Sequence, residues 1–258
     1  MGLLNKELSW AAITHPGVKH KQNQDAVIVD QDIHQSAWHG YGNLDIASKH
    51  LFAISDGVSQ SPNPSKASRT VLEGLYKSWL KTPDASSIRH KESIQNYLDK
   101  NTSHKLIGMS ATLVTALYNG LNFTIFNSGD SRAYLIDQQD IIQLSKDHTI
   151  LQRMLDDGEI TKDEAANASS LYNGLDQCFF ARSLDGPPRI QVCTTELQYG
   201  QYLLLCSDGL NLYISDDEIK NQLINSESCE TSVTQLFDLA IARGGEDNIS
   251  IICVTYEK

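Results

Sequence analysis

The stretches Phe52-Ala-Ile-Ser-Asp56-Gly57 and Leu203-Leu-Leu-Cys-Ser-Asp208-Gly209 repeat one design at two distant places in the chain. In each, a short apolar run typical of a buried strand ends in an aspartate, and the glycine that follows permits a tight turn with close backbone approach. A single Asp-Gly pair usually marks only a turn. Two near copies favour strands that deliver carboxylates to one edge of a sheet.

Three further carboxylates lie beside predicted strands: Asp25 in Asn23-Gln24-Asp25, Asp130 after Gly129, and Asp247 before Asn248. Buried carboxylates repel one another, so a cluster of five needs cations. Oxygen-only ligands select hard ions, and we therefore expect Mg²⁺ or Mn²⁺ rather than zinc. No H-E-x-x-H, Cys/His quartet, P-loop or G-x-S-x-G motif competes with this interpretation.

Short strand-like runs and helical stretches fill the rest of the chain. Apolar spacing and capping patterns predict helices over 65–80, 88–98, 150–156, after Thr161, over 215–224 and near 232–243. Strands are predicted over 8–14, 26–29, 51–55, 110–118, 121–127, 132–136, 190–196, 202–206 and 248–255. The stretch 168–189 contains two glycines and two prolines, which predicts an irregular surface excursion. We find no internal repeat or linker and expect one domain over 1–258.

Composition excludes several classes of protein. The 258 residues carry a formal net charge of −11, which argues against binding nucleic acid or an anionic membrane surface. No apolar segment is long enough to span a bilayer, and the N-terminus does not resemble a signal peptide. Five scattered cysteines without a C-x-x-C pair argue against a disulfide framework and fit a reducing compartment. We expect a cytoplasmic protein, and a monomer.

Seven short motifs in order carry a family resemblance: Asn23-Gln24-Asp25, Asp56-Gly57, Gly108-Met-Ser-Ala-Thr112, Gly129-Asp-Ser-Arg132, Asp147-His148, Ser207-Asp208-Gly209 and Asp247-Asn248. Together they resemble the metal-dependent protein phosphatases, the type 2C serine/threonine phosphatases, in their small bacterial form. Each motif alone is a common string, whereas the joint order and spacing are specific. The resemblance runs from about Thr14 to Val254.

The resemblance implies an α+β fold, a four-layer α-β-β-α sandwich of two antiparallel sheets flanked by helices. It also implies a flap segment at about 154–189 and a binuclear metal site at one edge of the sandwich. By this analogy Asp56 bridges two Mn²⁺ or Mg²⁺ ions, with the Gly57 carbonyl as a further ligand. Asp208 and Asp247 would hold the first ion and Asp25 the second, while Asp130 belongs to a loosely held third ion.

The activity implied is hydrolysis of phosphoserine or phosphothreonine in a protein substrate, opposing a serine/threonine kinase. Two cations lower the pKa of a bound water and clamp the phosphoryl oxygens, so no protein nucleophile is required. Catalysis would then depend on Asp25, Asp56, Asp208 and Asp247 through the metal-activated water. His148 is expected to hold a turn, and Arg132 to be an ion-pair partner.

Two positions depart from the family pattern. Where the family usually has an arginine that grips the substrate phosphate, this chain has His20 between Lys19 and Lys21. Arginine matches phosphate geometry with its planar fork, so these residues are imperfect substitutes and predict weaker phosphate binding. The alternative to a phosphate-binding role is that residues 19–21 are a solvated basic tripeptide without function. Val58 occupies the position where eukaryotic members have a general acid, which leaves the identity of that acid open.

Two rival functions remain at this point. A non-catalytic phosphatase-like module could bind a protein partner without turnover, which the changes at His20 and Val58 would permit. The intact carboxylates argue against it. A carboxylate-metal nuclease would use the same ions but lacks a basic stripe for its substrate.

Overall fold

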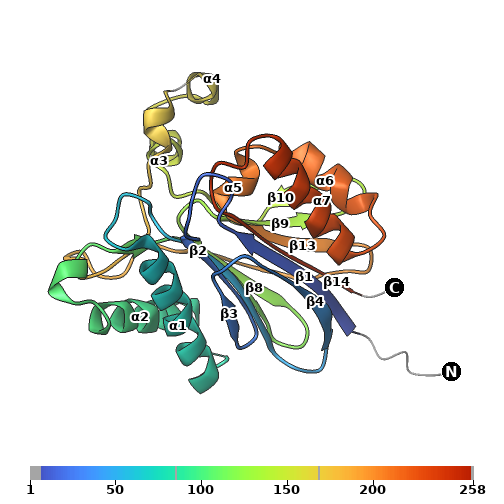
Figure 1. Cartoon of the computed structure of the whole chain (residues 1–258), viewed down its shortest axis with the longest axis horizontal. Helices are drawn as coiled ribbons and strands as arrows, with labels where there is room; N and C mark the ends of the chain where they lie inside the picture. Colours follow the sequence, from blue (N-terminus) through green and yellow to red (C-terminus); the bar gives the residue numbers. More distant parts are fainter. Residues whose placement is uncertain (1–6, 85, 168, 257–258) are drawn as a thin grey trace.

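In the computed structural model, which describes residues 7–84, 86–167 and 169–256, two six-stranded antiparallel sheets face each other (Figure 1). The first sheet has the order β10 (Ile141–Gln143), β9 (Arg132–Ile136), β13 (Tyr202–Cys206), β14 (Ile249–Tyr256), β1 (Glu7–His15) and β4 (Trp38–Asp45). The second has the order β12 (Gln191–Thr195), β8 (Phe123–Ser128), β7 (Leu113–Tyr118), β5 (His50–Asp56), β2 (Asp25–Val29) and β3 (Asp32–His34). A small sheet joins β6 (Ser110–Ala111) to β11 (Phe179–Phe180).

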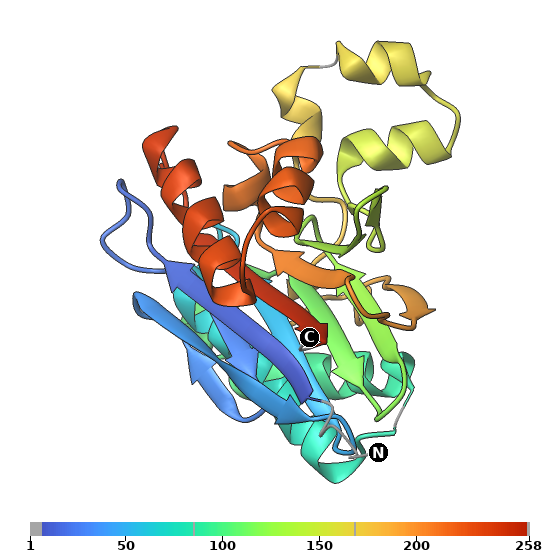
Figure 2. The same cartoon turned by 90° about the vertical axis from the view of Figure 1, so that its right-hand side faces the viewer.

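Helices cover the outer face of each sheet, which confirms the four-layer sandwich. The second sheet is covered by α1 (Pro64–Lys81) and α2 (Ser87–Lys100), and the first by α5 (Asp208–Asn211), α6 (Asp216–Ile224) and α7 (Cys229–Ala242). Two short helices, α3 (Ile150–Asp156) and α4 (Lys162–Ala166), project from the body of the sandwich (Figure 2). The 3₁₀ turns His104–Leu106 and Ser170–Asn173 complete the helical elements. Within the described residues, no helix combines the length and apolar character that crossing a bilayer requires.

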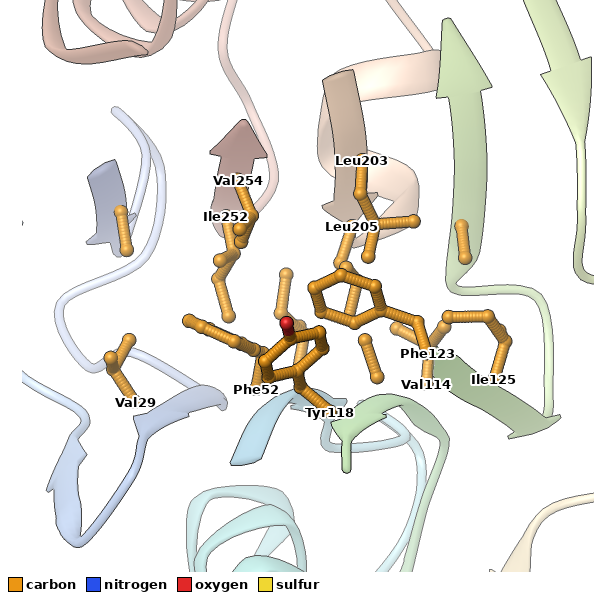
Figure 3. Packing of buried hydrophobic residues seen from close by; sticks show 14 of the residues in the cluster. Val29, Phe52, Val114, Tyr118, Phe123, Ile125, Leu203, Leu205, Ile252 and Val254 are labelled. Carbon is orange, nitrogen blue, oxygen red and sulfur yellow. The ribbon is translucent and has the colours of Figure 1, made fainter. Parts of the chain in front are cut away.

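The central strands are continuous apolar runs because both of their faces are buried. In β14, Ile252 and Val254 point into the core between the two sheets (Figure 3), whereas Ile251 and Cys253 contact the covering helices. Burying one such side chain contributes about 1.5–3 kcal/mol to the free energy of unfolding. The apolar runs that end at Asp56 and Asp208 were predicted to be buried strands, and the structure confirms both.

The edge strand β4 was missed, because its sequence does not resemble a buried strand. It alternates between exposed and half-buried residues and contains Gly40 and Gly42. A Cβ at Gly40 would lie 2.3 Å from the Trp38 ring, so the glycine makes room for that ring on the sheet. Trp38 in turn stacks on Trp10 at 6.4 Å between ring centroids.

Several short strands also differ from prediction, including β11, which lies in the stretch 168–189 that was predicted to be irregular. The three-residue edge strands β3 and β10 were missed, because neither is long enough to show a pattern. The predicted strand 110–118 was too long, because its first residues form β6 and pair with β11 in the small sheet.

A buried histidine makes the stability of this fold depend on pH. Burial alone would lower the pKa of His50, but hydrogen bonds to the Asp30 carboxylate and the Asp45 carbonyl raise it above its usual value. This contribution to stability is fully present below the unfolded pKa of about 6.5 and is lost as the pH rises through the higher folded pKa. Each pKa unit by which the folded value exceeds the unfolded value contributes about 1.4 kcal/mol to the free energy of unfolding.

We expect His50→Gln to flatten the fall in unfolding free energy between pH 6.5 and 8, measured by urea titration at several pH values. The exposed His39 provides the control, and His39→Gln should keep the wild-type slope. An unchanged slope in His50→Gln would show that the His50–Asp30 pair does not carry this pH dependence.

Candidate metal centre

The two sheets bring the five predicted carboxylates to one end of the sandwich. Asp25 begins β2 and lies opposite Asp56, the last residue of β5, in the antiparallel register. On the other sheet, Asp208 follows β13 and Asp247 precedes β14, and these two strands are neighbours. The charges of all four other aspartates act on Asp56, which places Asp56 at the centre of the cluster.

The carboxylates perturb one another strongly. Burial is the largest cause, and it raises the pKa of Asp25 and of Asp130 to about 7 and that of Asp208 to about 6. Nearby negative charges add to each rise. The pKa of Asp56 lies well above its ordinary value, first because of burial and then because of the neighbouring carboxylates. Divalent cations would offset this repulsion, since a buried charge is tolerated when it is paired or coordinates a metal.

Asp25 shows the clearest fit to a cation. Its Oδ2 accepts hydrogen bonds of 2.8 Å from the Ser207 and Ser250 hydroxyls, which lock the carboxylate in place. Its Oδ1 is buried and has no hydrogen-bond partner. An orphaned carboxylate oxygen facing other carboxylates suits a hard cation, for which oxygen ligands are preferred.

The carboxylates contact one another and do not form a complete coordination shell. In the stretches 7–84, 86–167 and 169–256, no three acidic, histidine or cysteine side chains form a ready-made metal cage. The Asp56 carboxyl lies close enough to Asp25 and Asp208 for the three groups to perturb one another. Like charges without a counterion repel one another, whereas bound cations would attract all the oxygens.

The glycines after Asp56 and Asp208 serve close packing. The predicted tight turns are wrong, because Gly57 pairs with Ala111 in an isolated β-bridge and Asp208 begins the short helix α5. A Cβ at Gly57 would lie 2.3 Å from the Pro64 carbonyl oxygen, and one at Gly209 would lie 1.9 Å from that of Asn248. The predicted close backbone approach is therefore correct at both positions.

A hollow of about 200 Å³ opens beside the cluster. Asp25 lies outside its lining, fully buried, whereas the other four aspartates line it. Its remaining walls are Gly57, Val58, Ser59, Thr112, Asn173, Gly174 and Leu175. The last three lie on the segment that returns from the projecting helices, so the flap region borders the carboxylates.

A polar network ties α5, which carries Asp208, to the first sheet. Arg132 forms a bidentate ion pair with Asp147, with the shortest N–O distance at 2.6 Å, as expected for an ion-pair partner. Arg132 also donates to the Tyr134 hydroxyl, which accepts a 2.7 Å hydrogen bond from the Asn211 amide. The guanidinium of Arg132 is therefore occupied by Asp147 and Tyr134, and Tyr134 in turn holds Asn211, the last residue of α5.

His148 has the structural role that was expected of it. Its Nδ1 accepts a hydrogen bond from the Gly129 backbone N–H, and the His148 backbone N–H donates to the Gly129 carbonyl. The pair fixes the turn that presents Asp130. Gly129 has a φ of +111°, and a Cβ there would lie 2.6 Å from the Thr112 side chain.

The three candidate phosphate-binding residues differ in their surroundings. Lys19 forms an ion pair with Glu246, and the His20 Nε2 lies 3.8 Å from an Asp247 oxygen. Lys21 is exposed and has no ion-pair partner among the described residues. None of the three lines the hollow. His20 is therefore the member of the tripeptide nearest to the carboxylates.

Several residues of the site carried no assigned role in the sequence. The Asn23 amide donates to the Thr14 hydroxyl at 2.7 Å, and Thr14 contacts the Ser250 hydroxyl at 2.9 Å. This buried chain of polar groups ends at Asp25. The sequence did contain an indication of this network. Ser250 interrupts the apolar first half of β14, and a buried hydroxyl needs a hydrogen-bond partner.

Comparison with known proteins shows what the chain resembles. The family model described as protein phosphatase 2C matches residues 17–154, more than half of the chain. The serine/threonine phosphatase stp of Listeria welshimeri is 28% identical over 217 residues, which cover 79% of this chain and 83% of that protein. The crystal structure of the serine/threonine phosphatase Stp1 from Staphylococcus aureus matches with a TM-score of 0.79 and 25% identity, covering 96% of this chain and 95% of that one.

A further match carries metal. The catalytic domain of the serine/threonine phosphatase PstP, solved in complex with two manganese ions, has a TM-score of 0.72 and 24% identity. The match covers 98% of this chain and 100% of that chain. These structures share the sandwich of two antiparallel sheets with flanking helices.

Proposed function

This chain belongs to the protein phosphatase 2C family, the metal-dependent serine/threonine phosphatases, and we propose that its carboxylate cluster binds two Mn²⁺ or Mg²⁺ ions that support phosphatase activity. The observation that carries the proposal is the convergence of four aspartates on Asp56, with an orphaned oxygen on Asp25. The substrates are phosphoserine and phosphothreonine in proteins.

Each carboxylate has a distinct proposed task. Asp56 faces carboxylates from both sheets and would contact both ions, with the Gly57 carbonyl beside it. Asp208 and Asp247, from neighbouring strands, would hold one ion, and Asp25, locked by two hydroxyls, the other. Asp130 lines the open side of the hollow and suits a third, weaker ion.

Bound cations supply a water of lowered pKa and neutralise charge on the transferring phosphoryl group. The chain's own residues position these ions and shape the hollow that admits the phosphate. No side chain is assigned as nucleophile. Val58 lines the hollow but cannot donate a proton, so the side-chain acid of eukaryotic relatives has no counterpart at this position.

The broader setting is also a proposal. All five aspartates of the proposed site come from the same chain, so the site needs no residue of a second copy, and we propose a monomer. The five cysteines are free of disulfides, which favours a reducing compartment, and we place the protein in the cytoplasm opposite a serine/threonine kinase.

Metal-dependent turnover tests the proposal most directly. A phosphothreonine peptide, an aryl phosphate and an oligonucleotide would each be assayed with Mn²⁺ and with chelator. We expect phosphate release from the first two that depends on metal, and none from the oligonucleotide. Metal binding measured by calorimetry without turnover on any substrate would favour the non-catalytic alternative.

His20 offers a test of phosphate binding. An arginine there would provide a planar fork for the phosphate in place of an imidazole, so His20→Arg should lower KM for a phosphopeptide about tenfold or less. It should also reduce the pH dependence of KM, because arginine stays charged. His39→Arg adds the same charge on exposed β4 and should change neither value. An unchanged KM in His20→Arg would refute the role of this position.

A further inference from the structure

A second, larger groove lies on the flap side of the proposed active site. Its volume is about 970 Å³, and its walls are Ile107 and residues of the segment 175–189. Three large apolar side chains in these walls, Ile107, Phe180 and Leu184, are exposed. Pro187 and Pro188 form another part of the wall and restrict the backbone there.

This groove adjoins the hollow that contains the carboxylates at Leu175, which lines both. Cys178, in the wall of the groove, is close enough to Asp130 for that carboxylate to act on its thiol. A polypeptide whose phosphorylated side chain reaches the carboxylates can continue over Leu175 into the groove.

Arg182 is held at the groove in an unusual backbone conformation. Its φ is +63°, in the left-handed region that residues with a Cβ rarely adopt. Two side chains of α2 hold the turn: Asp99 accepts a 2.7 Å hydrogen bond from the Arg182 N–H, and the Gln95 amide donates to the Phe180 carbonyl at 2.9 Å. Backbone strain of this kind clusters at functional sites, and glycine would avoid it.

The guanidinium of Arg182 is also free to bind an acidic group of a ligand. Arg153 and Arg189 both pair with Asp176, at 3.0 and 2.6 Å, so their charges are engaged. Arg182 is exposed and has no ion-pair partner in the part of the chain that the structure describes. Asp185 also lines the groove, three residues from Arg182, so the complementarity to an acidic group is local to the Arg182 guanidinium and the apolar side chains beside it.

We propose that this groove binds the substrate polypeptide beside its phosphorylated residue, and that Arg182 selects substrates with an acidic side chain there. An apolar side chain of the substrate would pack against Phe180 and Leu184. The proposal rests on the phosphatase function and adds a substrate class to it: phosphoproteins whose phosphorylated site is flanked by acidic and apolar residues.

The test compares three substrates with Mn²⁺ present. One is a phosphothreonine peptide flanked by aspartate and leucine, the second has asparagine in place of each aspartate, and the third is p-nitrophenyl phosphate. Wild type should favour the acidic peptide over its amide counterpart about tenfold in kcat/KM, as expected for one charge-assisted hydrogen bond. Arg182→Gly, which suits the left-handed backbone, should lose this preference.

Matched controls separate the groove from general effects. Arg89→Ala removes one exposed positive charge from α2 and should keep the preference. Leu184→Ser should lower kcat/KM for both peptides relative to p-nitrophenyl phosphate, whereas Leu121→Ser, on the distant β7–β8 connection, should not. The unfolding temperature of Arg182→Gly should be no lower than that of wild type.

The outcomes distinguish the two proposals. If wild type hydrolyses p-nitrophenyl phosphate but shows no preference between the peptides, the groove proposal is wrong and the phosphatase function stands. The same holds if Arg182→Gly retains the full preference. If wild type hydrolyses none of the three substrates with Mn²⁺, the phosphatase function itself fails.

Discussion

Replacing Asp56 by Asn is expected to reduce kcat roughly 10³-fold, because this carboxylate faces all the other proposed metal ligands and loses its charge. The same substitution should make the metal-free protein more stable. A carboxyl whose folded pKa lies above its unfolded value destabilises the fold at pH values above the unfolded pKa, and this cost grows until the pH passes the folded pKa. The neutral amide removes the cost, so the unfolding temperature without metal should rise by a few degrees.

Calorimetric unfolding with chelator and with Mn²⁺ would measure both effects. Wild type should gain stability from Mn²⁺, by about 2.7 kcal/mol at a hundredfold excess over the dissociation constant, and Asp56→Asn should gain almost none. Asp84→Asn is the control, because Asp84 is exposed and forms a surface ion pair with Lys49; it should shift stability by less than about 1 kcal/mol. A metal-free Asp56→Asn protein that is less stable than wild type would indicate that Asp56 has a structural role instead.

Much of the fold could be predicted because its central strands are buried on both faces. Runs such as Tyr202–Cys206 and Ile249–Tyr256 are apolar on both faces over most of their length, and helix α3 coincides with the predicted 150–156. The edge strand β4 escaped prediction because one of its faces is exposed and its glycines serve the rings of two tryptophans. That requirement comes from the tertiary structure and leaves no periodic signal in the sequence.

The candidate site also has a part that the sequence predicts and a part that it does not. The aspartates could be identified from their places at the ends of apolar runs, and the family resemblance added their proposed roles. Their anchors could not be identified in this way. Ser207 and Ser250 lie 182 and 225 positions from Asp25 along the chain, and only the pairing of β13 with β14 next to β2 brings them together. The peptide groove depends likewise on a turn whose conformation α2 imposes.

Gly209→Ala is expected to be the most damaging change to the site that leaves every polar group in place. The added Cβ would lie 1.9 Å from the Asn248 carbonyl oxygen and 2.9 Å from its carbonyl carbon, and these are backbone atoms that cannot rotate away. The Asn248 side chain is itself fixed, because its Oδ1 accepts from the Gln24 N–H and its amide donates to the Pro16 carbonyl. We expect a loss of about 3 kcal/mol in unfolding free energy, at the upper end of overpacking effects.

The same clash should weaken metal binding, because Gly209 follows Asp208 and Asn248 follows Asp247. Pushing the two backbones apart separates carboxylates that would hold one ion, so Mn²⁺ affinity should fall together with stability. Gly42→Ala controls for a general effect of glycine replacement: its Cβ would meet only the Trp10 side chain, at 3.3 Å, and should cost less than about 1 kcal/mol. Urea unfolding and Mn²⁺ titration calorimetry would measure the two quantities. If Gly209→Ala lost stability but bound Mn²⁺ with wild-type affinity, the spacing of Asp208 and Asp247 would not depend on this contact.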